Sequence, residues 1–162
     1  MNKLLISLTI FLFLQLGYSA NAQVTDTVEV EAGWNFLSLP LKVADYRKNI
    51  LFPSAVSDAF IFNGSYISKN TLENGDGFWL KFDSADTFFI TGETIHTETI
   101  SVHKGWNMVG SLTVPITPNH TWSEPYGIRI SGFYHYGLGA YLDLDTIKLY
   151  IFKTFWTLSC LN

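Results

Sequence analysis

The tripeptide Gly-Trp-Asn occurs twice in the chain, at residues 33–35 and 105–107, each time before a short apolar run. Two exposed tryptophans could stack on sugar rings, and the asparagine beside each could hydrogen-bond to sugar hydroxyls. Alternatively, the glycine permits a positive φ, the indole fills the core and the asparagine ties down adjacent backbone. Because a tryptophan followed by a dense apolar run is usually buried, the sequence favours the structural interpretation of both tripeptides.

Four tyrosines are better candidates than these tryptophans for a ligand-binding face: Tyr66, Tyr134, Tyr136 and Tyr141. Exposed aromatic rings could bind a carbohydrate, and their burial distinguishes this function from a purely structural one. Carbohydrate binding gains support if about three aromatic side chains lie coplanar on an exposed face, and loses it if they are buried.

Candidate catalytic and metal-ligating residues are scattered along the chain. His96 and His103 fall on opposite faces of any single strand, while His120 and His135 belong to separate segments. The chain contains no His-x-x-x-His, His-x-His or Gly-x-Ser-x-Gly, and its single cysteine, Cys160, lies in an apolar tail. Pairs among the 14 acidic residues carry little weight, since any chain with that many acids offers them. The sequence therefore predicts no enzyme, no cofactor and no metal site.

The elements that must position these residues are mainly strands. Valines alternate with glutamates over residues 28–31, the period-2 pattern of a sheet with one solvated face, and a denser apolar run over 34–39 ends at Pro40. A hairpin with an Asn-Gly turn is predicted over residues 60–67, and a glycine-bounded aromatic strand over 77–82.

Two further strands are predicted at residues 86–92 and 96–102, with a bend between them at Gly-Glu. One short helix is predicted near residues 45–51, with Asp45 as a possible N-cap and Pro53 ending it. The expected fold is all-β, a β-sandwich or a pair of barrel-like lobes.

The second half of the chain aligns with the first as an imperfect repeat. Aromatic residues match in this alignment: Trp34 with Trp106, Phe60 with Phe133, and Tyr66 with Tyr141. The sequence predicts a first β repeat over 23–98 and a second, incomplete one over 99–147. The Gly-x-Gly-Phe-Trp strand of the first repeat has no evident counterpart in the apolar tail, residues 148–162. A frameshift or truncated gene end is favoured for this tail, with a genuine last strand as the alternative.

The stretches "GWNFLSLPL", "NTLENGDGFWLKF" and "GWNMVGSLTVPI" together resemble a repeated β module of large secreted bacterial proteins. Such modules often precede a C-terminal type IX secretion sorting domain, and the resemblance covers most of residues 28–147. It implies export and a structural or accessory role, and it carries over no catalytic residue. This chain departs from the pattern in lacking the second aromatic-Trp strand and a following sorting domain.

The chain begins with the features of a signal peptide, predicted over residues 1–22. Lys3 precedes an apolar stretch, and Ala20-Asn21-Ala22 has the small-x-small form of a cleavage site. The apolar stretch is shorter than the roughly 20 residues that span a bilayer, so no membrane span is expected after cleavage. The net charge of −4, without a basic stripe, argues against a nucleic-acid partner.

These observations favour a secreted, non-catalytic structural or accessory β module, a fragment of a larger exported or cell-surface protein. The alternative is a carbohydrate-binding module that uses exposed aromatic residues. A polysaccharide or other cell-surface proteins are the expected partners. The expected location is secreted or at the cell surface, or periplasmic if the missing sorting domain prevents further export.

Overall fold

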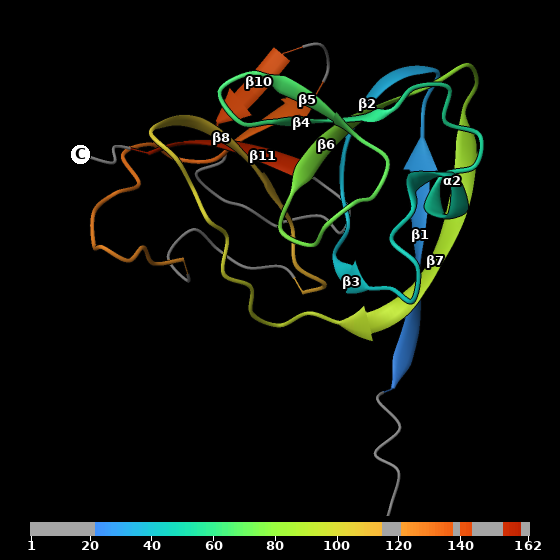
Figure 1. Ribbon diagram of the computed structural model, residues 1–162, viewed down its shortest axis with the longest axis horizontal. Coiled ribbons are helices and arrows are strands. Elements are labelled where there is room, and N and C mark those ends of the chain that lie inside the picture. Colours follow the sequence, from blue (N-terminus) through green and yellow to red (C-terminus); the bar gives the residue numbers. More distant parts are fainter. Residues whose placement is uncertain (1–21, 115–120, 138–139, 144–153, 160–162) are drawn as a thin grey trace, which may run out of the picture.

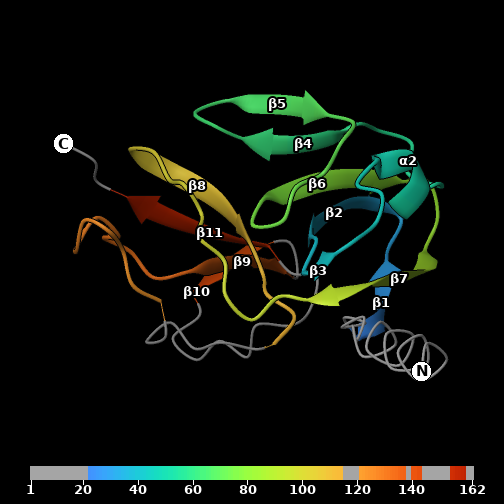
Figure 2. The ribbon, with the colours of Figure 1, turned by 60° about the horizontal axis from the view of Figure 1, so that its bottom comes forward.

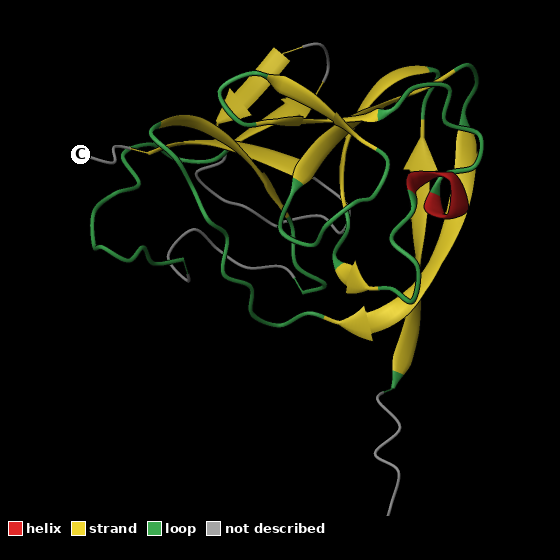
Figure 3. Cartoon of the chain, viewed as in Figure 1, coloured by secondary structure: helices red, strands yellow, loops and turns green. Residues whose placement is uncertain are grey.

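The computed structural model describes residues 22–114, 121–137, 140–143 and 154–159 (Figure 1). The predicted signal peptide, His120 and Cys160 lie outside these ranges, apart from the leader's last residue. The described part is built from antiparallel strands and one short helix (Figure 3), which confirms the all-β class. Its strands form three open sheets, so the sandwich rather than the barrel-like alternative describes this chain.

The three-stranded sheet has the order β1-β7-β3 and comprises β1 (Gln23–Val30), β7 (Asp86–Thr94) and β3 (Leu41–Lys42). The Val-Glu alternation in β1 has the predicted result, because Val28 and Val30 are buried while Thr27 and Glu29 are exposed. β7 pairs along the whole of β1.

One four-stranded sheet has the order β2-β6-β4-β5. It comprises β2 (Gly33–Ser38), β6 (Gly77–Phe82), β4 (Ala59–Phe62) and β5 (Tyr66–Lys69). The predicted hairpin is β4-β5, and Gly64 in its turn has a φ of 73°, a value that glycine adopts readily.

The other four-stranded sheet has the order β8-β11-β9-β10, shown beside the first in Figure 2. It comprises β8 (Gly105–Gly110), β11 (Thr154–Ser159), β9 (Tyr134–Gly137) and β10 (Ala140–Asp143). Taken strand by strand, its order repeats that of β2-β6-β4-β5. β11 comes from the apolar tail and holds the place that β6 holds in the first sheet.

The two sheets also agree in register. In the first, Trp79 pairs with Phe36 on one side and with Phe60 on the other. In the second, Trp156 pairs with Met108 and with Tyr134. Strand pairing therefore matches Phe60 with Tyr134, one residue beyond the Phe133 that the sequence alignment suggested.

The predicted helix is confirmed as α2 (Lys48–Leu51), but the expectation that Asp45 caps it is wrong. The N-cap residue is Arg47, which makes no side-chain cap. Asp45 instead accepts hydrogen bonds from the backbone N–H and the guanidinium of Arg47, two residues away, and so cannot reach the first turn. Within the described ranges, no helix combines the length and apolarity needed to cross a membrane.

The expected strand over residues 96–102 is also wrong, because β7 runs through Gly92 without the predicted bend and the chain then continues as a loop. A Cβ on Gly92 would lie 2.5 Å from the carbonyl oxygen of Lys42. The glycine therefore serves the close approach of β3 to β7, and it does not mark the end of a strand.

The main core lies between the three-stranded sheet and the first four-stranded sheet. Phe52, which follows α2, is fully buried there and meets Phe78, Phe82 and Phe88 edge-on, with ring centroids 6.1, 6.4 and 5.2 Å away. A second, smaller cluster centres on Phe36 and Met108, where the two four-stranded sheets meet.

Candidate functional site

The two Gly-Trp-Asn tripeptides form the same local structure at the start of β2 and of β8. Gly33 and Gly105 both have a φ of 99°, a region that residues with a Cβ rarely adopt. Asn107 accepts a hydrogen bond from the N–H of His103 and donates to the carbonyls of His103 and Gly105, at 2.8–2.9 Å.

Asn35 repeats these bonds with Glu31 and Gly33, at 2.8–3.2 Å. The predicted roles of the glycine and the asparagine are thus confirmed.

The expectation that the two tryptophans fill the core is wrong: Trp34 is 51% exposed and Trp106 is 44% exposed. The physical reason is that β2 lies between two clusters. Leu37 belongs to the main core, while Phe36 on the opposite face belongs to the smaller one. A dense apolar run therefore does not specify one buried face, and Trp34 lies on the Phe36 face at the open end of the strand.

Trp34 lines a cleft of about 650 Å³ together with Phe60, Tyr66, Trp79 and Tyr136. Trp34 and Phe60 meet edge-on, with ring centroids 5.8 Å apart and planes at 65°. Trp79 and Tyr136 do the same at 5.3 Å and 73°, which brings β9 of the second sheet to the cleft of the first. These rings are not coplanar, so the flat aromatic platform that would support carbohydrate binding is not present among them. Trp34 and Tyr66 are nevertheless exposed, and the rings form the walls of a cleft.

The cleft has a fixed floor, and polar residues share the face of the sheet on which it lies. Trp79 is held by a stacked contact with buried Phe36, with centroids 4.5 Å apart and planes at 21°. Lys81 pairs with Trp34 and Ser68 pairs with Phe60 across the sheet, so both polar side chains share the face that carries the aromatic rings. All the described residues that line the cleft are aromatic.

The four predicted tyrosines have different places in the structure. Tyr66, 55% exposed, and Tyr136 both line the cleft. Tyr134 lies against Trp106, with ring centroids 5.7 Å apart. Tyr141 pairs with Tyr136 through the backbone, and its side chain lies outside the described part. The sequence offered Trp34 as a sugar-binding residue but favoured its burial. It did not indicate Phe60 and Trp79 as cleft residues, and only the pairing of strands distant in sequence could have done so.

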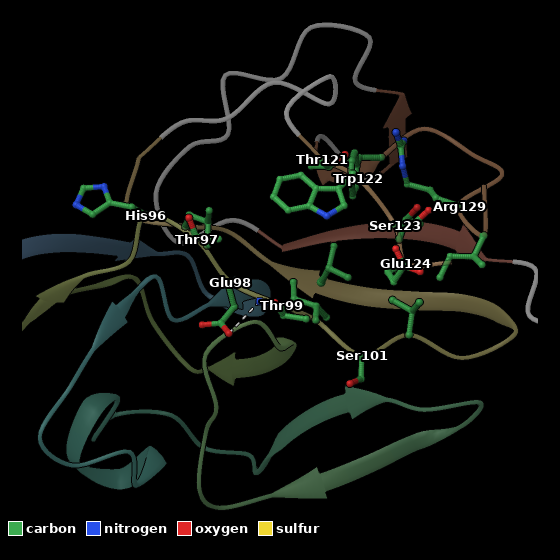
Figure 4. A pocket seen from close by; sticks show the side chains of 17 residues that line it. His96, Thr97, Glu98, Thr99, Ser101, Thr121, Trp122, Ser123, Glu124 and Arg129 are labelled. Carbon is green, nitrogen blue, oxygen red and sulfur yellow. Dashed lines mark hydrogen bonds between the residues drawn. The ribbon is translucent and has the colours of Figure 1, made fainter. Parts of the chain in front are cut away.

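A second cavity, of about 620 Å³, lies beside the loop that follows β7 (Figure 4). His96 and Glu98 border it from this loop, and Trp122, Glu124 and Arg129 from a second loop. Two of its charged groups have local partners: Glu98 accepts a hydrogen bond from the N–H of Thr99, and Arg129 donates to the carbonyl of Ser131. Among the described residues, no three His, Cys, Asp or Glu side chains are arranged to hold a metal ion.

A charged cluster lies at the end of β5 and in the segment that leads to β6. The ammonium of Lys69 lies 2.7 Å from a carboxylate oxygen of Glu73 and 3.3 Å from one of Asp76. Burial raises the pKa of Asp76 above 3.8, and Lys69 opposes this only in part. The backbone of Asp76 also forms an isolated β-bridge to Val109 of β8, so the main chain beside this half-buried carboxylate contributes to the junction between the sheets.

Comparison of the chain with protein-family models, with curated proteins and with solved structures finds no match.

Proposed function

We propose that this chain is an exported, non-catalytic accessory β module whose aromatic cleft binds a carbohydrate chain. The observation that carries the proposal is the cleft itself, in which Trp34 and Tyr66 remain about half exposed. Several aromatic side chains that gather in one exposed patch mark an interaction site, whereas single exposed apolar residues do not.

The chemistry of the cleft favours a sugar over an aliphatic ligand. The C–H face of a sugar ring is attracted to the negative face of an aromatic ring, while its hydroxyls need polar partners at the edge. Here the walls are tryptophan, tyrosine and phenylalanine, of which the first two carry polar N–H or O–H groups, and Lys81 and Ser68 lie on the same face of the sheet. A volume of about 650 Å³ is within the usual size of a small-ligand site.

Export and a modular origin form the remainder of the proposal. The predicted signal peptide supports export, and the resemblance to secreted Gly-Trp-Asn modules supports an accessory role at the cell surface. The common strand order of the two four-stranded sheets supports the duplication of one β unit.

The experiment is binding of the purified chain, expressed with its own leader, to a glycan array and to insoluble polysaccharides. We expect Trp34→Ala to weaken binding at least about tenfold, equivalent to about 1.4 kcal/mol. Phe89→Ala is the matched control, because Phe89 is 73% exposed but lies on β7, away from the cleft. Absence of binding to every glycan, or equal losses in the two variants, would contradict the proposal.

A further inference from the structure

We infer that the chain carries a second carbohydrate subsite, formed around Trp106 and Tyr134, so that one glycan chain is held at two places. The inference rests on the proposed function, because it assigns the same class of ligand to the second sheet. It goes beyond that function in making this small chain a bivalent binder.

Aromatic residues occupy equivalent positions in the two four-stranded sheets. Each of the first-sheet residues Trp34, Phe60 and Trp79 has an aromatic counterpart at the same place in the pairing of the second sheet. These counterparts are Trp106, Tyr134 and Trp156. The described backbone therefore carries three of the five aromatic positions of the first cleft twice.

The aromatic side chains of the two sheets also have the same geometry. The rings of Trp106 and Tyr134 meet edge-on with centroids 5.7 Å apart and planes at 69°. The corresponding values for Trp34 and Phe60 are 5.8 Å and 65°. Trp106 is 44% exposed, close to the 51% of Trp34, so its indole is also available to a ligand.

The backbone around both tryptophans is held in the same way. Each tryptophan follows a glycine with a φ of 99° and precedes an asparagine that bonds back to the preceding backbone. A backbone that is fixed before binding loses little conformational entropy when a ligand arrives. Tyr134 adds a phenolic hydroxyl where the first site has Phe60, a group that can donate or accept a hydrogen bond.

Two sites on one small module suit a linear polysaccharide. Once one site has bound, the second meets its ligand at a high effective concentration, and overall affinity rises without any new contact. A short oligosaccharide that fills one site gains nothing from this linkage. Chain length of the ligand therefore separates one site from two.

The test uses the full chain, a polysaccharide to which it binds, and a short oligosaccharide of the same sugar. Calorimetric titration with the oligosaccharide should give two sites in the unmodified protein and one in both Trp34→Ala and Trp106→Ala. Each variant should bind the polysaccharide at least about tenfold more weakly, through loss of linkage. Trp122→Ala, which removes an 81% exposed tryptophan, should change neither measurement.

The possible failures are distinguishable. If the unmodified protein binds no glycan, the proposed function is wrong. If it binds one oligosaccharide and only Trp34→Ala abolishes binding, the proposed function stands and the second subsite is disproved. Trp106→Tyr keeps an aromatic ring on β8 and should retain part of the second site. One further result would overturn the inference. In it, Trp106→Ala loses the second binding site and also unfolds at a lower urea concentration, whereas Trp106→Tyr loses no binding at all.

Discussion

The hydroxyl groups of Ser38 and Ser111 share a hydrogen bond, with their oxygens 3.0 Å apart, where the two four-stranded sheets meet. Both residues are buried, and the N–H of Ser111 also donates to the Ser38 hydroxyl, at 3.2 Å. Ser38 is the last residue of β2 and Ser111 directly follows β8. The two strands that begin with Gly-Trp-Asn therefore contact each other at their C-terminal ends. Thr113 extends this contact by donating to the carbonyl of Pro40 at 2.5 Å.

Replacement of these serines should destabilise the protein unequally. Ser111→Ala removes one hydroxyl hydrogen bond and should cost about 1 kcal/mol of unfolding free energy. Ser38→Ala removes the same hydrogen bond and also the hydroxyl oxygen that accepts from the buried N–H of Ser111. It should therefore cost about 1–3 kcal/mol of unfolding free energy. Urea denaturation measures both costs, with exposed Ser68→Ala as the control. A larger cost for Ser111→Ala would show that this pair does not join the sheets as described.

The two asparagines of the repeated tripeptides should differ in the same manner. Both hold the backbone through three hydrogen bonds, but Asn107 is 3% exposed whereas Asn35 is partly exposed. Water can replace the lost bonds more readily at Asn35. We expect Asn107→Ala to cost about 2–3 kcal/mol and Asn35→Ala about 1 kcal/mol, measured by thermal and urea unfolding. Equal costs would argue against the difference in burial.

Gly110 should not tolerate a side chain. A Cβ there would lie 2.8 Å from the carbonyl oxygen of Asp76 and 3.1 Å from the Cβ of Ser38, so the sheets would have to separate. Gly110→Ala should therefore cost about 1–3 kcal/mol through overpacking.

Gly64→Ala is the contrasting variant for Gly110, because its added Cβ meets nothing within 4 Å and the cost comes from its φ of 73° alone. We expect about 1 kcal/mol for this backbone strain. A measurement of glycan affinity distinguishes overpacking in Gly110→Ala from backbone strain in Gly64→Ala. Displacement of β8 in Gly110→Ala should weaken binding, whereas Gly64→Ala should leave the sheet junction unchanged.

Stability should respond to pH in opposite directions at two aspartates. Burial raises the pKa of Asp76, so the folded state retains a proton that the unfolded chain loses as pH rises above 3.8. Relative to Asp76→Asn, the unmodified protein should thus lose stability as pH rises from 3.8 through the folded-state pKa.

Hydrogen bonds from Ser54 and from the N–H of Thr87 lower the pKa of Asp86. Relative to Asp86→Asn, the unmodified protein should therefore gain stability as pH rises toward 3.8, and the gain is lost as pH falls through the folded-state pKa. Urea unfolding of the three proteins between about pH 2 and pH 7 measures both trends. The same sign for both variants would contradict these assignments.

Local signals in the sequence were sufficient for much of the fold. The alternation in β1, the Asn-Gly turn of the β4-β5 hairpin and the glycine-bounded β6 depend on backbone preferences and on period-2 patterns that neighbouring residues establish. The same holds for Gly33 and Asn35, whose conformation and hydrogen bonds involve residues at most four positions apart.

The tertiary structure decided which faces are buried. Nothing local to Trp34 indicates that β2 lies between two apolar clusters and leaves the indole exposed, because this depends on β6 and on the second sheet. The cleft likewise joins Trp34, Tyr66 and Tyr136 from strands distant in sequence. The place of β11 beside β8 follows from pairing alone, since its residues carry no Gly-x-Gly pattern. Short-range preferences thus determined strands such as β1, β4, β5 and β6, and long-range packing determined the place of β11 and the surface with which we propose the protein binds.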